Sequence, residues 1–563
     1  MIAPPPTEHA PARGHSAAQW IARLDAPDAA VRSALAAVYG PLTRVLEERK
    51  ALLKRVLLHF AGNYGDASVR VFRAPGRINL RGMHVDTHGG YLNLMTHDRE
   101  TVIVAAPNSQ REFCFSNLER RHATVVLKVE EWTRRPAFGR EWNDFIDDPG
   151  TRAALRPAGG EWRNYLLGGI LSIQHRFRER PLGGLYAAVG SDIPIGAGLS
   201  SSAALSVAAQ FAILATNGLS LPGDIDRIMA AREAEWFCGA RVGLSDPGAL
   251  VLGGRNTLVS AALPPASPDL ESARRLAWPE DLTLLIVDSF TRRNLSGEQR
   301  LEFIRNRFAY SIALDVFVHE LVRMGMTPDE AAPFRSLDTM AGLPPRTMFT
   351  ALQSVPITDT VDELKRRYPL PTLELAYAHY FGDLPASRRP GTISLRGPLI
   401  YGIAESERAR MFADYVSGGD YEAAGRAMST GHDGDRIVLP TGKPASCDVS
   451  DEALGRMRDE HIPIAACPGV YRASTPALDM LVDTALNAGA LGASLTGAGM
   501  GGSIMALCRR SSAAEVASAL RLVLAQPQYD AVARLREPLT EPETRSAVNE
   551  NYATAAAAEL FLP

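Results

Sequence analysis

The sequence has 563 residues, of which 46% are hydrophobic and 22% charged, and its formal net charge is −3. This length predicts two or more domains with large cores, and the charge argues against the global basic field of a nucleic-acid-binding protein. No uninterrupted apolar run is long enough to span a bilayer and no signal peptide precedes the first domain, so we expect a cytoplasmic protein with no membrane partner.

The chain opens with residues 1–15, which are rich in proline and alanine and are expected to be disordered. From Ser16 to about Phe60, leucines and valines recur at helical spacing on one face. Residues 1–68 are therefore predicted to form a helical extension. It packs either on the body of the protein or on a second subunit, and the sequence does not choose between the two.

Strands and helices alternate over the next part of the chain, residues 69–289. Short apolar or alternating runs predict strands at 68–74, 101–107, 113–116, 124–129, 185–189 and 282–288, and a strand pair at 250–254 and 256–260. Helical composition is found at 165–175, 203–216 and 225–242. We expect a first domain that ends near Ser289.

The remaining residues, 290–563, are predicted to form a second domain with two insertions. A long helix is expected at 300–324, two helices at 404–428, a helix at 476–489 and a strand at 503–508. The insertions are expected near 325–395, which holds many prolines and short helical pieces, and near 434–470.

The five cysteines are scattered without a C-x-x-C pair, which argues against a disulfide framework or a zinc knuckle and favours reduced thiols. The alternation of elements predicts an α/β or α+β protein.

The most informative stretch is Pro194–Leu205, which reads PIGAGLSSSAAL and lies between a predicted strand and a predicted helix. Glycines allow a tight turn, and the serines stand beside the unpaired amides of the first helical turn, where phosphate binds well. From spacing alone, an ordinary glycine loop with a serine cap is as good an interpretation. It is not a Walker loop, because no G-x-x-x-x-G-K-[ST] occurs.

Two more glycine-rich stretches change this balance: PGRINLRGMHVDTHGG from Pro75, and LTGAGMGGS from Leu495. In this order, the three stretches resemble the three motifs of the GHMP small-molecule kinases, and the first most resembles the galactokinase branch. WRNYLLG from Trp162 and FCGARVGLSD from Phe237 resemble two further segments of that branch. The resemblance covers roughly residues 69–310 and 395–510.

The resemblance implies an α+β fold with two lobes, a mixed-sheet N-terminal domain and an α/β-sandwich C-terminal domain, with the active site between them. It implies ATP- and Mg²⁺-dependent phosphorylation of galactose, or of a related sugar such as galacturonate or arabinose, at the anomeric hydroxyl. The partners would be a small sugar and ATP, with the oligomeric state left open.

The resemblance also assigns the residues that hold ATP and the metal. The loop would bind phosphate through Gly196, Ala197, Gly198, Leu199, Ser200, Ser201 and Ser202. Ser202 would direct its hydroxyl toward Mg²⁺, a hard ion that prefers oxygen ligands. The motif position for the assisting glutamate is Ala234, flanked by Glu233 and Glu235, of which we favour Glu235. Trp162 and Tyr165 would lie near the adenine, although as core aromatics they need no function.

Asp246 is the candidate base, and Arg77 its positive partner. By resemblance, Asp246 takes or orients the proton of the anomeric hydroxyl, and Arg77 keeps it ionised and stabilises the transferring phosphoryl group. Alone, Asp246 would be read as a helix cap before a proline and Arg77 as a surface ion pair. The F-x-G-x-x-x-G register favours the catalytic interpretation.

By resemblance, His84 and Asp86 would bind sugar hydroxyls, Gly243 would also belong to the sugar site, and a loop containing Gly497, Gly499 and Gly501 would close the site. The alternative for that glycine loop is a simple turn. A rival interpretation of His84, Asp86 and His88 is a metal site of a hydrolase, because the three alternate along the chain.

The chain departs from the galactokinase pattern around the sugar. The glutamate expected before the motif histidine is Met83, Arg81 occupies a usually apolar place, and a sugar-contacting tyrosine falls near Arg300. Loss of an acid and gain of arginines suggest a substrate other than galactose. A hexuronic acid such as galacturonate, or a pentose such as arabinose, would fit, since arginine binds carboxylate in a bidentate manner.

A catalytically weak sensor of sugar and ATP is the alternative function, because some members of this family act as regulators. Retention of Asp246 and Arg77 argues against it, whereas Met83 and Ala234 keep it open. Other GHMP substrates, such as homoserine or mevalonate, are less favoured.

Overall fold

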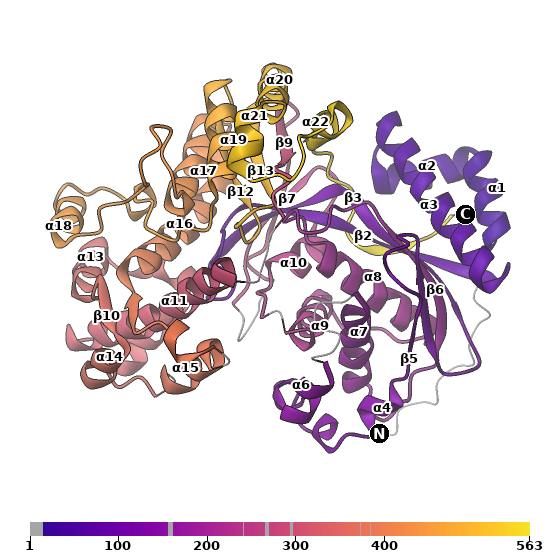
Figure 1. Cartoon of the computed structure of the whole chain (residues 1–563), viewed down its shortest axis with the longest axis horizontal. Coiled ribbons are helices and arrows are strands. Elements are labelled where there is room, and N and C mark those ends of the chain that lie inside the picture. The colour runs from indigo at the N-terminus through magenta and orange to yellow at the C-terminus, as the bar shows by residue number, and fades with distance from the viewer. Residues whose placement is uncertain are drawn as a thin grey trace.

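The computed structural model of the chain describes residues 15–155, 162–239, 241–264, 270–292, 297–371, 373–382 and 384–562. The disorder expected for residues 1–15 therefore falls, except for His15, outside the described residues. Two lobes lie side by side (Figure 1), as expected for the α+β fold.

The first lobe is built on a sheet that has nine strands in the described part of the chain. Its main path runs β1-β2-β3-β6-β4-β5; β15 pairs with β2, β7 pairs with β3, and β8 pairs with β7. The pairs are antiparallel except β4 with β6, so the sheet is mixed. The bounds are β1 (His15–Ser16), β2 (Ser68–Arg81), β3 (Tyr91–Pro107), β4 (Phe113–Asn117), β5 (Val125–Leu127), β6 (Leu185–Ser191), β7 (Thr257–Ala262), β8 (Arg274–Ala277) and β15 (Ala558–Leu560).

Helices cover both faces of this sheet. The helical extension consists of α1 (Ala17–Asp25), α2 (Ala29–Tyr39) and α3 (Thr43–Tyr64), and α3 packs on β3 and β6. On the other face, α8 (Ser201–Thr216) and α10 (Ser245–Leu252) pack on β2 and β3, with α7 (Trp162–Arg176) and α9 (Asp224–Phe237) beyond them. Three short helices, α4 (Glu130–Thr133), α5 (Trp142–Asp147) and α6 (Pro149–Leu155), complete this layer.

The alternation of side chains along β3 shows where the extension belongs. Val102 and Val104 share a core with α1–α3, whereas Ile103 and Ala105 belong to the main core. Successive strand residues point to opposite faces, so a strand buried throughout needs cover on both sides. The extension supplies that cover for the sheet of its own chain. The sequence left open whether the extension packs on the body of the protein or on a second subunit, and the structure shows that it packs on the body.

The second lobe contains a smaller antiparallel sheet, in the order β12-β13-β9-β14. Its strands are β9 (Leu282–Asp288), β12 (Gly492–Thr496), β13 (Ser503–Arg509) and β14 (Val548–Glu550). Around it lie α16 (Arg396–Gly418), α17 (Tyr421–Asp435), α19 (Pro476–Asn487), α20 (Ala513–Leu524), α21 (Pro527–Ala533) and α22 (Glu541–Ala547). Because β9 pairs in this sheet, we propose that the boundary between the lobes precedes Leu282 rather than following it near Ser289.

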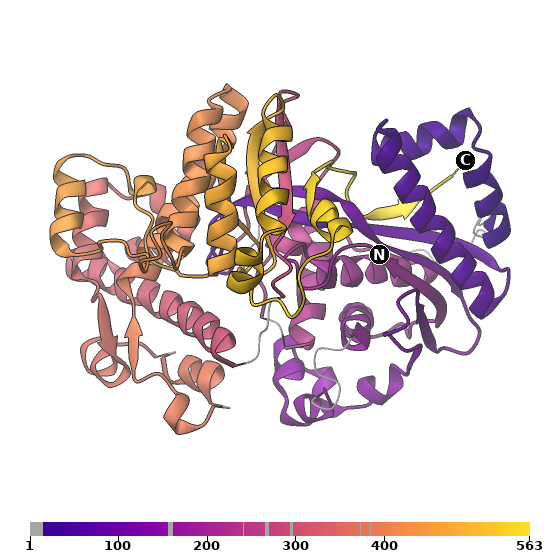
Figure 2. The same cartoon turned by 45° about the horizontal axis from the view of Figure 1, so that its top comes forward.

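The long helix α11 (Gly297–Arg323) leads into the proline-rich segment. That segment forms α12 (Pro328–Ala331), α13 (Pro345–Ser354), α14 (Val361–Arg367), α15 (Leu373–Phe381) and a hairpin of β10 (Thr358–Thr360) and β11 (Thr392–Ser394). Together with α18 (Asp451–Asp459), these pieces gather on the left of Figure 2, away from α1–α3.

The strand predicted at residues 250–254 is wrong. Residues 250–252 form the last turn of α10, and only β7 of the expected pair is a strand. A short apolar run next to glycines does not distinguish a strand from the end of a buried helix.

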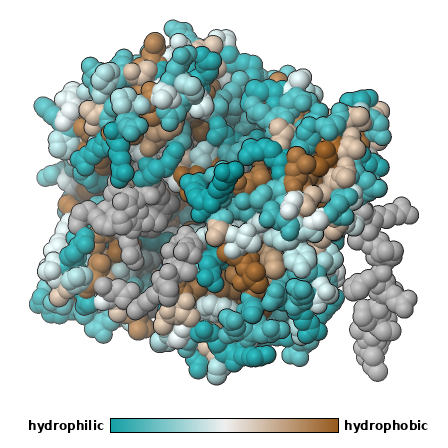
Figure 3. All heavy atoms as spheres, turned by 45° about the vertical axis from the view of Figure 1, so that its right-hand side comes forward, coloured by the Kyte–Doolittle hydropathy of each residue, from teal (hydrophilic) through white to brown (hydrophobic). Residues whose placement is uncertain are grey.

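The surface in Figure 3 is mostly hydrophilic, and hydrophobic side chains occur there as separate patches. Among the described residues, no helix has both the length and the apolar composition needed to cross a membrane.

Candidate active site

The three glycine-bearing motifs meet where the two lobes join. The Arg77 amide in β2 donates to the carbonyl oxygen of Leu199 over 3.2 Å. A Cβ on Gly198, whose φ is 76°, would lie 2.8 Å from the Thr496 carbonyl oxygen, and one on Gly497 would lie 2.8 Å from the Gly198 carbonyl oxygen. Side chains at these glycines would push the loops apart.

The loop Gly196–Ser202 runs from β6 into the first turn of α8. Ala197 and Leu199 are buried and anchor the loop, and α8 begins at Ser201. The first amides of a helix have no partner within it and carry its positive dipole end. Ser200 precedes them in the left-handed region, with φ 62°. This geometry suits binding of phosphate groups.

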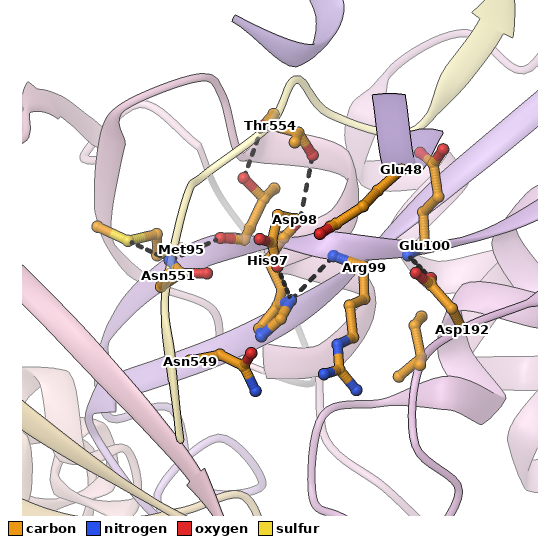
Figure 4. A network of polar contacts seen from close by, with 12 residues as sticks. Glu48, Met95, His97, Asp98, Arg99, Glu100, Asp192, Asn549, Asn551 and Thr554 are labelled. Carbon is orange, nitrogen blue, oxygen red and sulfur yellow. Dashed lines mark hydrogen bonds and ion pairs between the residues drawn. The ribbon is translucent and has the colours of Figure 1, made fainter. Parts of the chain in front are cut away.

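The residues before this loop are fixed by a polar network, part of which is drawn in Figure 4. The Asp192 carboxylate accepts from the Glu100 amide over 2.9 Å and from Nη1 of Arg49 in the helical extension over 3.0 Å. His97 lies on the same strand as Glu100. Its carbonyl oxygen accepts a hydrogen bond of 3.1 Å from Thr554 Oγ1 in the C-terminal segment. Both ends of the chain thus brace the strand beside the phosphate loop.

Asp246 and Arg77 are in direct contact, as the resemblance implied. Arg77 Nε donates to Asp246 Oδ1 over 2.6 Å, and its Nη1 donates to the Gly198 carbonyl oxygen. The hydroxyl of Ser200 donates to Asp246 Oδ2 over 2.5 Å. Asp246 therefore sits in the first turn of α10 with both oxygens oriented, between the phosphate loop and a cavity.

That cavity has a volume of about 100 Å³ and lies next to the phosphate loop. Polar groups from several separate segments line it, among them Arg77, Asn79, His84, Asp86, Ser245, Asp246, Arg307, Tyr310 and Tyr471. Such a density of donors and acceptors is what recognition of a polyol requires.

His84 and Asp86 enter this cavity from the first motif. The His84 ring stacks on Tyr471 with centroids 4.2 Å apart, and its Nε2 lies 3.4 Å from Asp435 Oδ1. Asp86 accepts a hydrogen bond of 2.6 Å from the Ser245 hydroxyl. A Cβ on Gly243 would lie 2.2 Å from Asp86 Oδ2, so only glycine fits beside this carboxylate.

The Ser202 hydroxyl at the start of α8 and the Glu235 carboxylate on α9 together have the chemistry of a Mg²⁺ site. The Ser202 hydroxyl is 3.5 Å from Oε2 of Glu235, which is buried on α9. Glu233, the other candidate, instead pairs with Arg176. The donor set of Ser202 and Glu235 suits a hard ion that is also held by phosphate oxygens and water.

The hydrolase interpretation of His84, Asp86 and His88 is wrong. His88 turns away and hydrogen-bonds through Nε2 to Ser311 and through Nδ1 to Thr87, each over 2.9 Å. Burial, together with the Arg307 charge, lowers the pKa of His88 to about 3. No group of three or more histidine, cysteine, aspartate or glutamate residues in the described part of the chain could hold a metal ion.

The expected role of Arg81 in sugar binding is also wrong. Arg81 is fully buried, pairs with Glu405 of α16 and donates to the Met428 carbonyl oxygen over 3.0 Å. Met83 lies in the hydrophobic core. Burial alone would raise the pKa of Glu405, but Arg81 and Arg408 outweigh it and hold that pKa below its usual range. The side chain of Arg300 lies outside the described residues.

Four cavity residues had no sequence signal of their own, and one of them is Tyr310 on α11. Arg307 lies on α11, in a helix with no motif, and Tyr471 follows the second predicted insertion. Ser245 stands beside Asp246 but was not singled out, although its hydroxyl contacts Asp86.

Trp162 and the glycines of the third motif are the remaining site residues expected from the sequence. Trp162 begins α7, half-buried, with its ring 5.7 Å from that of His122. Gly497, Gly499 and Gly501 all have positive φ, and a Cβ on Gly499 would lie 2.2 Å from the Ala473 carbonyl oxygen. The glycine loop is therefore packed tightly against its surroundings on several sides, which a simple turn would not require.

Parts of this chain match models of known protein families. Residues 164–254 match the GHMP kinases N-terminal domain, residues 451–526 the GHMP kinases C-terminal model, and residues 59–107 the galactokinase galactose-binding signature. The crystal structure of Lactococcus lactis galactokinase complexed with galactose has the same fold, with a TM-score of 0.59 at 18% identity over 89% of this chain and 98% of that one. Three parts of this chain thus match models of GHMP kinases and galactokinases, and its fold is that of a galactokinase.

The matched signature and the curated relatives make the chain similar to galactokinases. It is 25% identical to a galactokinase of Chloroflexus aggregans over 83% of this chain and 91% of the relative. It is also 25% identical to a galactokinase of Mycobacterium bovis, over 87% and 98% of the two chains.

Proposed function

We propose that this protein transfers the γ-phosphate of ATP to the anomeric hydroxyl of a monosaccharide. The observation that carries the proposal is the position of Asp246, held by Arg77 and Ser200 between the phosphate loop and a polyol-type cavity. Phosphoryl transfer needs an acceptor hydroxyl oriented toward the γ-phosphate and positive charge near the transferred group. The names of the relatives support the same reaction class.

Each group has a defined role in this proposal. Asp246 accepts or orients the proton of the sugar hydroxyl, and Arg77 keeps the carboxylate ionised and neutralises charge on the transferred group. The amides of the first turn of α8 bind the phosphates. Ser202 and Glu235 would hold Mg²⁺, which would neutralise phosphate charge when bound. His84 and Asp86 bind sugar hydroxyls.

The sugar that we favour is a hexuronic acid such as galacturonate, ahead of galactose and arabinose. Arg307 lines the cavity, and among the described residues no carboxylate pairs with its guanidinium. Its positive charge acts on His88 and Tyr471, whereas Arg77 faces Asp246 and the phosphate loop. An arginine in a polyol cavity that has no ion-pair partner among the described side chains suits a carboxylate on the sugar.

The test is ADP release from purified protein with Mg-ATP and galactose, galacturonate or arabinose, beside an Asp246→Asn variant. Turnover that the variant loses would support the kinase, and the preferred sugar would identify the substrate. A clear preference for galactose would contradict the uronic acid. Binding of ATP and sugar without turnover of any sugar would favour the sensor instead.

A further inference from the structure

A pair of thiols lies in the second predicted insertion, outside the machinery described above. The Sγ atoms of Cys447 and Cys467 are 3.9 Å apart, although the two residues are distant in sequence. Cys447 is partly exposed and Cys467 is buried. A disulfide requires its sulfur atoms to approach to about 2.05 Å, so a small movement would join these two.

The chemistry of the pair is asymmetric. The hydrogen bond from the Cys467 thiol lowers the pKa of Cys447 to about 7, and the Gly469 amide acts in the same direction. The hydrogen bond with Cys447 and burial raise the pKa of Cys467, and burial raises the pKa of Cys114, Cys238 and Cys508. Because the thiolate is the reactive form, Cys447 is the cysteine best suited to attack a disulfide, with Cys467 placed to resolve the product.

Cys467 is connected to the sugar cavity through two routes. Its carbonyl oxygen accepts from Arg408 Nη1 over 2.8 Å, and Arg408 Nε donates to Glu405 over 2.9 Å. Glu405 in turn accepts from the Gly82 amide, over 2.8 Å, in the first motif. Four residues after Cys467, Tyr471 stacks on His84 inside the cavity.

We propose that Cys447 and Cys467 form a reversible disulfide that alters the sugar cavity. A low-molecular-weight disulfide of the glutathione type is the oxidant. The Cys447 thiolate attacks one of its sulfurs and releases one thiolate, which leaves a mixed disulfide. Cys467 gives up its proton and attacks the Cys447 sulfur, which closes the bridge and releases the second thiol. The protein loses two hydrogen atoms, and the oxidant is reduced to two thiols.

Closure of the bridge draws the Cys467 backbone toward Cys447. Its carbonyl oxygen then shifts against Arg408, and the segment that carries Tyr471 shifts against His84. We expect the oxidised protein to bind the sugar more weakly, with little change in ATP binding, because no part of this route includes the phosphate loop.

The experiment exposes the reduced full-length protein to glutathione disulfide and follows free thiols, intact mass and peptide maps. Cys447→Ser and Cys467→Ser are the test variants, and Cys238→Ser is the matched control, since Cys238 is also only partly buried. Hydrogen–deuterium exchange at residues 79–90 and 468–474 reports on the cavity without any kinase assay, so the result does not depend on the proposed reaction.

We expect the wild type and Cys238→Ser to lose two thiols, to gain a Cys447–Cys467 bridge and to change exchange in both segments, with full reversal by dithiothreitol. The Cys467→Ser variant should stop at a glutathione adduct on Cys447. Persistence of both free thiols, or a bridge between other cysteines, would overturn the proposal. A bridge that leaves exchange in both segments unchanged would overturn its link to the cavity.

Discussion

Gly243 leaves the space that the Asp86 carboxylate occupies, since a Cβ at position 243 would lie only 2.2 Å from Asp86 Oδ2. The two residues come from different motifs, one after β2 and the other before α10. The second glycine of the FCGARVGLSD segment is therefore explained by a side chain of the first motif.

A methyl group at this position should weaken sugar binding. We expect Gly243→Ala to displace Asp86 and break its hydrogen bond with Ser245, which lowers kcat/KM for the sugar by roughly 10- to 100-fold, the effect of losing a hydrogen bond to a charged group. Steady-state kinetics check this, and KM for ATP should change little. Gly342→Ala is the control, because its Cβ would have no neighbour within 4 Å. An unchanged KM for the sugar in Gly243→Ala would contradict the role of Asp86.

Arg307 should decide between acidic and neutral sugars. In Arg307→Gln, kcat/KM for galacturonate should fall by roughly 10- to 100-fold, because a charge-assisted hydrogen bond is lost. The value for galactose should hardly change. Arg323→Gln on the same helix, with an exposed side chain, should leave both values as they are. Equal losses with both sugars would argue that Arg307 serves the fold or the phosphate rather than a carboxylate.

The two glutamates beside Ala234 should differ in their effect on Mg²⁺. Glu235→Gln should raise the Mg²⁺ concentration needed for half-maximal rate, since it removes the negative charge beside the Ser202 hydroxyl. Glu233→Gln should remove the ion pair with Arg176 and leave the Mg²⁺ dependence unchanged. Titration of activity with Mg²⁺ at fixed ATP separates the two. The assignment is refuted if Glu233→Gln alone shifts the curve.

Glu405 should be a major source of stability. It is fully buried between Arg81 and Arg408, so Glu405→Gln would leave buried positive charge uncompensated. We expect the free energy of unfolding to fall by about 3–5 kcal/mol, as when one partner of a buried ion pair is removed. Urea denaturation measures this. Glu407→Gln, whose partner is the more exposed Arg410, should lose much less.

The same residue makes the stability dependent on pH. Since the pKa of Glu405 is lower in the folded protein than in the unfolded chain, its contribution is fully present above the unfolded pKa of about 4.3 and is lost as pH falls through the folded pKa. Denaturation curves should therefore show a steeper acid dependence for the wild type than for Glu405→Gln. Equal slopes below pH 4 would be inconsistent with this assignment.

The resemblance to the GHMP kinases implied that the motifs converge, and that resemblance was visible because the glycines and the Asp246 register are local signals. Arg81 was misjudged because its partner, Glu405, lies 324 residues away in a helix without any motif. A charge inside a binding motif looks like a ligand contact when its counter-ion is not visible in the sequence.

The strand predicted at residues 250–254 failed for a different reason. Those residues are apolar because α10 is buried between β2 and its neighbours, and burial alone leaves no helical or strand periodicity. Arg307 and Tyr471 could not be predicted at all, since only the packing of α11 and of the segment after Cys467 brings them to the cavity.

The strand β2 leads into the first motif. It pairs with β1 at Ser68 and Val69 and with β15 at residues 71–73, and these two partner strands are almost the whole described chain apart in sequence. Residues 558–560 therefore complete a sheet whose other strands are made much earlier during synthesis. On the ribosome, the first lobe cannot reach its final pairing until residues 558–560 have emerged. The two lobes should then appear as one cooperative unit in unfolding experiments rather than as two separate transitions.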